Sequence, residues 1–190
     1  ALKDSVQMRR TQATHSMGRK PDGSATWNVF TAPTPNAANS GTGYASYAPR
    51  PVMNLPPGFY SGTKLVALSV TPSNSLTIYY TTDGSEPTTG SNVYVSTPIS
   101  VATTSVIRAY AVSSDATILP SFMETNTYFI NETIDSHYGV VSISGGAPLN
   151  QLLGGTQNTP NTHLEYFENQ AFKTEGYGSA NKHGNDSWAY

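Results

Sequence analysis

Cysteine is absent from the 190 residues of this chain, so neither a disulfide framework nor a thiolate metal site can form. Charge is also scarce, because Asp, Glu, Lys and Arg make up only 12% of the residues, about half the usual share. The formal net charge is −2 and there is no basic run, which argues against binding to nucleic acid or to an anionic membrane surface. No stretch approaches the roughly 18 apolar residues of a membrane-spanning helix, and the first residues do not resemble a signal peptide.

The residues that are present favour short strands joined by many turns. The chain has 16 Gly, 13 Pro and 12 Tyr, and it is rich in Ser, Thr and Asn. Aromatic and β-branched residues suit strands, whereas Gly, Pro and Asn suit turns. We therefore predict an all-β protein. A low-charge β chain of this kind is typical of an exported bacterial protein, and its start at Ala1 without Met leads us to expect a piece of a longer polypeptide.

The composition changes along the chain and predicts four segments. Residues 1–39 contain a turn, a short strand and a loop, and about 40 residues cannot bury a stable core alone. They therefore need either further chain upstream or a neighbour to pack against. Residues 40–56 are rich in Pro and Gly and are predicted to be a linker. Residues 57–130 are predicted to form a β-sandwich, and residues 131–190 a second incomplete β-rich segment.

Strand signals are most regular in the predicted sandwich. Alternation is clearest in residues 105–113, where Val106, Arg108 and Tyr110 would point to one face of the strand. Short strands at close spacing indicate an immunoglobulin-like or fibronectin-III-like sandwich. The predicted strands are 64–71, 76–82, 92–95, 98–101, 105–113 and 125–130. In the last segment, strands are predicted at 138–144 and 162–168, a helical turn at 149–153, and a Gly/Asn/Ser-rich tail at 176–190.

The segment "IYYTTDGSEPT", residues 78–88, breaks from a strand into an Asp-Gly turn. Asp83 is expected to cap its own turn and Gly84 to supply a positive φ angle. Asp22 and Gly23 repeat the same pattern near the N-terminus. A structural turn is the favoured interpretation of both.

A calcium site is the competing interpretation of the later turn, with Asp83, Ser85 and Glu86 as its ligands. Calcium takes 6–8 oxygen ligands and usually a repeated acidic pattern, which this segment lacks. We therefore predict no metal site there.

Tyrosines form the candidate ligand surface, because aromatic faces suit contacts with sugar rings. Tyr79, Tyr80 and Tyr94 are the main candidates, and Tyr110 and Tyr128 accompany them. Adjacent residues of a strand point to opposite faces, so Tyr79 and Tyr80 cannot both serve one platform. Packing in the core and at its rim, with the hydroxyl reaching water, is the favoured alternative.

No catalytic arrangement stands out in the sequence. The four histidines, His15, His137, His163 and His183, lack helical metal-ligand spacing. Glu165 lies three residues before Glu168 on a predicted strand, so the two carboxylates should point apart and be solvated. There is no nucleophile elbow, Walker loop or dinucleotide fingerprint. The sequence thus predicts no catalytic residue, cofactor or metal.

Three segments resemble known families. "PPGFYSGTKLVALSV", "IYYTTDGSEPT", "PISVATTSVIRAYAV" and "TNTYFI" resemble, in this order, the accessory module at the C-terminus of chitobiases and hexosaminidases, which has a fibronectin-III-like fold. "HSMGRKPDGSATWNVFTAPTPNAAN", residues 15–39, resembles the end of a lamin-tail domain. "HYGVVSIS", "THLEYFE" and "KHGNDSW" resemble the start of a CotH-type spore-coat or atypical-kinase domain.

These resemblances imply a non-catalytic segment of a large, multidomain bacterial protein that is secreted or attached to the cell surface. Such a segment would space or present neighbouring modules, as in adhesins or cargo of type IX secretion. Its expected partners are neighbouring domains of the same polypeptide, secretion or cell-surface machinery, or glycans. Two alternatives remain: part of a CotH-like protein kinase whose catalytic residues lie downstream, and a carbohydrate-binding module.

Overall fold

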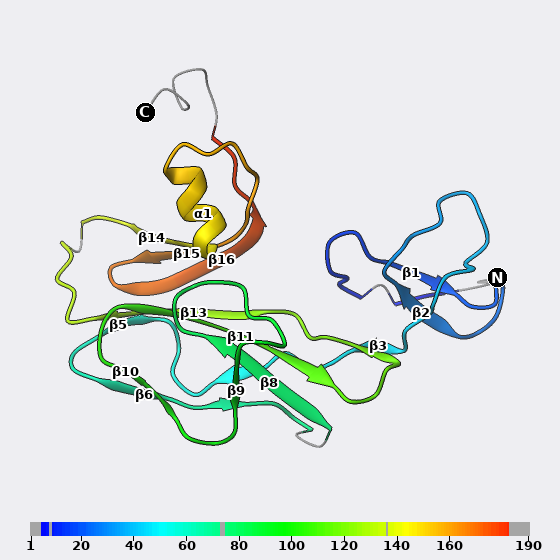
Figure 1. Ribbon diagram of the computed structural model, residues 1–190, viewed down its shortest axis with the longest axis horizontal. Helices are drawn as coiled ribbons and strands as arrows, with labels where there is room; N and C mark the ends of the chain where they lie inside the picture. Colours follow the sequence, from blue (N-terminus) through cyan, green and yellow to red (C-terminus); the bar gives the residue numbers. More distant parts are fainter. Residues whose placement is uncertain (1–4, 8, 73–74, 136, 183–190) are drawn as a thin grey trace.

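The computed structural model describes residues 5–7, 9–72, 75–135 and 137–182 (Figure 1). His183 and all but the first residue of the "KHGNDSW" segment lie outside the described residues. The described chain is mostly β, with several sheets and one short helix, which confirms the predicted fold class. The elements are β1 (Ser16–Arg19), β2 (Trp27–Phe30), β3 (Ser46–Tyr47), β4 (Val52–Met53), β5 (Gly58–Tyr60), β6 (Lys64–Val66), β7 (Leu68–Ser69), β8 (Leu76–Thr81), β9 (Asn92–Tyr94), β10 (Ile99–Val101), β11 (Ser105–Ser113), β12 (Ile118–Leu119), β13 (Glu124–Ile130), β14 (Val140–Ser144), α1 (Gly146–Leu153), β15 (Asn161–Glu168) and β16 (Ala171–Ser179).

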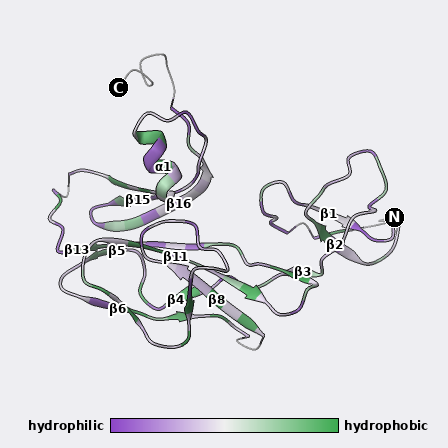
Figure 2. Ribbon diagram, viewed as in Figure 1, coloured by the Kyte–Doolittle hydropathy of each residue, from purple (hydrophilic) through white to green (hydrophobic). Residues whose placement is uncertain are grey.

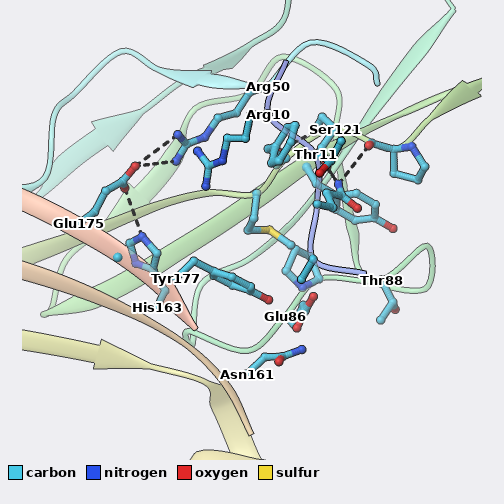
Figure 3. Close-up of a pocket in the computed structure, with 18 of the residues that line it drawn as sticks. Arg10, Thr11, Arg50, Glu86, Thr88, Ser121, Asn161, His163, Glu175 and Tyr177 are labelled. Carbon is cyan, nitrogen blue, oxygen red and sulfur yellow. Dashed lines mark hydrogen bonds and ion pairs between the residues drawn. The ribbon is translucent and has the colours of Figure 1, made fainter. Parts of the chain in front are cut away.

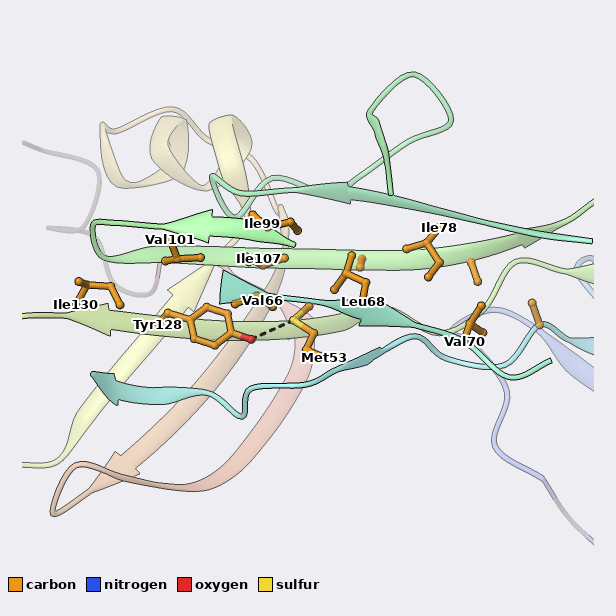
Figure 4. Close-up of a cluster of buried hydrophobic side chains, with 13 residues drawn as sticks. Met53, Val66, Leu68, Val70, Ile78, Ile99, Val101, Ile107, Tyr128 and Ile130 are labelled. Carbon is orange, nitrogen blue, oxygen red and sulfur yellow. Dashed lines mark hydrogen bonds between the residues drawn. The ribbon is translucent and has the colours of Figure 1, made fainter. Parts of the chain in front are cut away.

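A five-stranded sheet, in the order β5-β13-β11-β8-β9, forms the main layer of the sandwich. The pairs β4–β7 and β6–β10 face it and close an apolar core between the two layers (Figure 4). Alternation along β11 divides its side chains: Ile107, Ala109 and Ala111 are buried in this core, whereas Arg108 and Tyr110 point to the outer face. The core consists of Ala48, Met53, Val66, Leu68, Val70, Ile78, Ile99, Val101, Ile107, Ala109, Ala111, Tyr128 and Ile130.

Residues 40–56, predicted to be a linker, are part of the sandwich. β3 pairs in parallel with β12, and β4 pairs with β7. Ala48 and Met53 are buried in the sandwich core. The prolines that suggested a linker lie next to very short strands, at positions where no inner ladder bond is lost.

A third sheet, β14-β15-β16, lies on the outer face of the five-stranded sheet (Figure 1). Phe167 of β15 is fully buried and meets Phe129 edge-on, with ring centroids 5.2 Å apart. It also meets Phe59 at 5.9 Å, and Phe59 stacks on Phe129 at 4.3 Å. The main sheet is thus covered on both faces, by the sandwich core on one and by the third sheet on the other.

The N-terminal hairpin β1–β2 attaches to the sandwich through polar contacts. Tyr47 of β3 takes part in two of them: its hydroxyl accepts a hydrogen bond from the Gln12 amide at 3.1 Å and lies 2.7 Å from Nδ1 of His15. The Gln12 side chain also donates to the Ser121 carbonyl at 3.0 Å. This segment therefore packs on its neighbour.

The sequence missed β16 and underestimated α1. Residues 171–179 form a full strand, although residues from 176 onward were predicted to be a tail. The hairpin before it turns at Asn169 and Gln170, with φ angles of 51° and 60°. Two positive φ angles make a tight hairpin turn, which is usually signalled by Asn-Gly rather than Asn-Gln. Helix α1 is short and mixes apolar and polar residues (Figure 2), and no helix among the described residues is long and apolar enough to cross a membrane.

Candidate functional site

A groove of about 790 Å³ lies between β16 and the sandwich (Figure 3). We call it the β16 groove. One wall is formed by Glu175, Gly176 and Tyr177 of β16, and the other by residues 10–13 and 120–123. Its volume falls in the range of ligand-binding clefts, about 300–1,000 Å³. It brings together charged and aromatic side chains from segments far apart in the sequence and is therefore the candidate site.

Arg50 anchors a charged network along the groove. Its Nε lies 2.6 Å from Glu124 Oε2, and Nη2 lies 3.3 Å from Glu175 Oε1. The second oxygen of Glu175 lies 3.2 Å from Nε2 of His163 (Figure 3). Burial raises the pKa of Glu124, against the opposing charge of Arg50. Arg50 thus bridges carboxylates on β13 and β16 and ties the third sheet to the sandwich.

His163 is 5% exposed and faces this network from β15. Its burial lowers the pKa of the imidazole, and the neighbouring Glu175 carboxylate only partly offsets that effect. The imidazole is therefore neutral near neutral pH. Its Nδ1 is buried and has no hydrogen-bond partner among the described residues.

Glu165 corrects one expectation from the sequence. It was predicted to be solvated, but it is 1% exposed, between β15 and β13. The Thr127 amide donates to Glu165 Oε1 at 3.2 Å, and the Thr127 hydroxyl donates to Oε2. Burial raises the pKa of Glu165 to about 7, against these hydrogen bonds. Glu168, by contrast, is exposed, so alternation separates the two carboxylates as predicted.

The Asp83–Gly84 turn lies where the third sheet meets the sandwich. Oδ1 of Asp83 accepts hydrogen bonds from the Ser85 amide at 3.0 Å and the Ser85 hydroxyl at 2.5 Å. Gly84 has a φ of 74° and is buried, and a Cβ there would lie 3.2 Å from Cβ of Ser144. The turn is therefore also a contact point for β14.

Arg108 lies behind the same turn and is fully buried. Its Nη1 donates to the Gly84 carbonyl at 3.3 Å, whereas Nε has no hydrogen-bond partner among the described residues. The Asp22–Gly23 turn, by contrast, is exposed. Gly23 has a φ of 75°, and Oδ1 of Asp22 accepts a hydrogen bond from the Asn39 amide at 3.2 Å.

The three candidate tyrosines do not share one surface. Tyr80 and Tyr94 pack against the sandwich core, with ring centroids 6.3 Å apart. Tyr79 lies on the opposite face of β8, where its ring is 5.7 Å from that of Tyr110. Tyr128 is fully buried, and its hydroxyl donates to the Leu55 carbonyl at 2.8 Å. Strand alternation therefore rules out a joint Tyr79–Tyr80–Tyr94 platform.

The described residues contain no cluster of three His, Asp or Glu side chains arranged to hold a metal ion. His15 stacks on Tyr47, and His137 bonds to Asp135 at 2.5 Å. Asp83 is occupied by the Ser85 hydrogen bonds described above. Sequence reasoning missed Arg50, Glu175 and Tyr177, because their roles depend on the docking of β16.

The family model of the chitobiase/beta-hexosaminidase C-terminal domain matches residues 55–118, about a third of the chain. No curated protein sequence and no solved structure matches the chain. The matched residues run from just before β5 to the start of β12 and include the whole of β8 and β11. The middle of the chain is therefore a chitobiase/beta-hexosaminidase C-terminal domain with an immunoglobulin-like sandwich fold.

Proposed function

We propose that this chain is a non-catalytic accessory segment of a secreted or cell-surface bacterial protein, where it holds neighbouring modules in a fixed orientation. The observation that carries the proposal is the docking of the third sheet onto the outer face of the sandwich. Phe59, Phe129 and Phe167 form a shared apolar contact, and Glu165 bonds to Thr127 beside it. A joint of this kind suits a spacer that sets an angle between modules.

The energetics support a rigid joint. Burying one large aromatic side chain contributes about 2–3 kcal/mol, and edge-to-face aromatic pairs add about 1 kcal/mol each. Ion pairs of Arg50 lie at the rim of the same contact, where half-exposed charges contribute little to stability and mainly fix orientation. The interface is thus stabilised by its aromatic centre and oriented by its charged edge.

The placement outside the cell rests on two supports. Modules of the chitobiase/beta-hexosaminidase C-terminal type are typical accessory parts of secreted glycosidases, and residues 55–118 are of this type. The chain also has few charged residues and is rich in Ser, Thr, Asn and Tyr, a composition typical of exported β proteins. The proposal extends to the two flanks. Residues 1–39 would be the end of a lamin-tail-like domain, and residues 131–190 would be the start of a CotH-like domain in cargo of type IX secretion. Under this proposal, any kinase chemistry would belong to residues beyond this chain.

Spin-label distance measurements test the proposed spacing role, and the absence of cysteine makes labelling simple. Ala25→Cys places a label on the exposed loop of the N-terminal hairpin, Val95→Cys on the sandwich and Gln157→Cys beside the third sheet. We expect one narrow distance distribution for the Val95–Gln157 and Ala25–Val95 pairs. Broad distributions for both pairs would show loosely tethered modules and would refute the proposal. Steady release of product from a chitooligosaccharide would refute its non-catalytic part.

A further inference from the structure

The outer edge of β16 presents unpaired backbone groups to the β16 groove. β16 pairs only with β15 among the described strands, and all nine of its residues are exposed. Ala180 N–H donates to the Pro160 carbonyl at 2.9 Å, just past the Asn161–Ser179 pair. In an antiparallel ladder, hydrogen-bonded pairs alternate with non-bonded ones. Residues 178, 176 and 174 therefore bond to β15, and the N–H and C=O groups of Glu175, Tyr177 and Ser179 point away from it.

These outward groups coincide with the groove. Glu175, Gly176 and Tyr177 of β16 line it, and Asn161 and His163 of β15 line it as well (Figure 3). A second depression, of about 400 Å³, continues along Phe172, Lys173 and Thr174. Among the described residues, the sandwich thus forms a floor beside β16 along both depressions.

Edge strands usually carry protection against pairing with other chains. The first half of β16 has such protection. The ladder shifts register between Tyr166 and Phe167 of β15, and the extra residue that this leaves in β16 is the charged Lys173. The second half carries one charged residue, Glu175, which is already paired with Arg50 and His163, and a Cβ added at Gly176 or Gly178 would meet nothing within 4 Å. The open part of the edge is the part that lines the groove.

We propose that the β16 groove binds an extended polypeptide segment, which adds to the third sheet as a strand antiparallel to β16. Strand addition uses main-chain hydrogen bonds for affinity and neighbouring pockets for specificity. A strand in a sheet occupies about 160 Å³ per residue, from its spacings of about 4.8 Å, 10 Å and 3.4 Å. The groove volume of about 790 Å³ therefore accommodates about five residues.

Charges at the two ends of the groove define the chemistry of the segment. Arg10 and Arg50 lie toward one end and Glu86 toward the other (Figure 3). Glu175 pairs with Arg50 at the arginine end, and Tyr177 lies two residues further along β16 toward Glu86, so β16 runs from the arginine end to the Glu86 end (Figure 3). An antiparallel partner would run in reverse. Its first residue would be basic, facing Glu86, and its last would be acidic, facing Arg10.

The test is a titration with a capped Lys-Thr-Val-Thr-Glu peptide, followed by the backbone amide signals of the protein in NMR spectra. We expect saturable shifts at Glu175, Tyr177 and Ser179 at millimolar peptide. The capped reversed peptide, Glu-Thr-Val-Thr-Lys, should bind about fivefold or more weakly, because both end charges then face like charges. Saturable binding elsewhere on the chain, or equal binding of both peptides, would overturn the proposal.

Tyr177→Pro removes one outward N–H without breaking a bond to β15, and Tyr177→Ala is the matched control that loses only the side chain. Relative to the alanine variant, the proline variant should bind the peptide about five- to tenfold more weakly, the effect of one lost hydrogen bond. A peptide N-methylated at its central residues repeats the test on the unmodified protein, should the proline variant not fold. Unchanged binding of that peptide would overturn strand addition, and a chitooligosaccharide that shifts these amides while the peptide does not would assign the groove to sugar.

Discussion

Ionisation of Glu165 should weaken the joint between the sandwich and the third sheet. The carboxyl is buried and its pKa is raised from 4.5 to about 7. Burial is the largest cause of this rise. The hydrogen bonds from Thr127 oppose it, whereas the nearby carboxylates of Glu175 and Glu124 add to it. Glu165 is thus the group through which pH acts most directly on this interface.

The sign and size of the effect follow from linkage. A carboxyl with a raised pKa binds more protons when folded than when unfolded between pH 4.5 and 7. The free energy of unfolding therefore falls as pH rises through this window, and the loss is complete above pH 7. A rise from 4.5 to about 7 corresponds to at most about 3 kcal/mol. Glu165→Gln keeps the size and the hydrogen-bonding capacity of the side chain but removes its ionisation.

Urea unfolding at pH 4.5 and pH 8.5, followed by far-UV circular dichroism, checks this prediction. At pH 8.5 the Gln variant should be more stable than the wild type by up to about 3 kcal/mol, and at pH 4.5 the two should agree within about 1 kcal/mol. Glu168→Gln, at an exposed position on the same strand, is the control and should change neither value. A wild type that matches the Glu165→Gln variant at both pH values would refute the account of this buried carboxyl.

Three further predictions concern the same joint. Phe167→Ala should destabilise the protein by about 3–5 kcal/mol, measured by urea unfolding, because Phe167 is fully buried; a cost below about 1 kcal/mol would mean that the third sheet is not docked. Gly84→Ala and Gly23→Ala should each cost about 1–2 kcal/mol in the same assay, because both positions have a positive φ. Gly84→Ala should cost more than Gly23→Ala, because only a Cβ at Gly84 would lie 3.2 Å from Cβ of Ser144, and equal costs would contradict that contact. His163→Gln should reduce the loss of stability below pH 6.5, because a buried histidine with a lowered pKa binds more protons when unfolded; identical acid unfolding curves would contradict its neutral, buried state.

Local patterns predicted the sandwich well. The strand predicted at residues 105–113 has the same bounds as β11, and the strand predicted at 76–82 differs by one residue from β8. Both are rich in β-branched and aromatic residues and are followed by clear turn residues, so the pattern and the local backbone preference agree. The predicted strand 64–71 is divided instead into β6 and β7, which pair with different partners. Periodicity cannot reveal such a change of partner.

The candidate site could not be predicted, because it depends on contacts between distant segments. Glu165 and Phe167 alternate with Leu164 and Tyr166 on a strand whose buried face is decided by docking, and neither face carries a clear apolar majority. β16 was missed because Gly176 and Gly178 suggested a loop. These glycines lie in a strand that pairs with β15 on one edge only and whose residues are all exposed. Large β-branched or aromatic side chains would therefore gain little packing there. The turn at Asn169 and Gln170 also lacks the Asn-Gly pair that usually marks such a hairpin.

Native-state hydrogen exchange tests the central claim most directly, namely that the third sheet and the sandwich form one unit. Exchange of ladder amides in β13 and β15 would be followed by NMR at increasing, sub-denaturing urea concentrations. We predict that both sets converge on the same opening free energy, because Phe167 and Glu165 must leave their β13 neighbours when β15 opens. Opening of β15 at a markedly lower free energy, while β13 remains protected, would show a separately unfolding segment and would contradict the account.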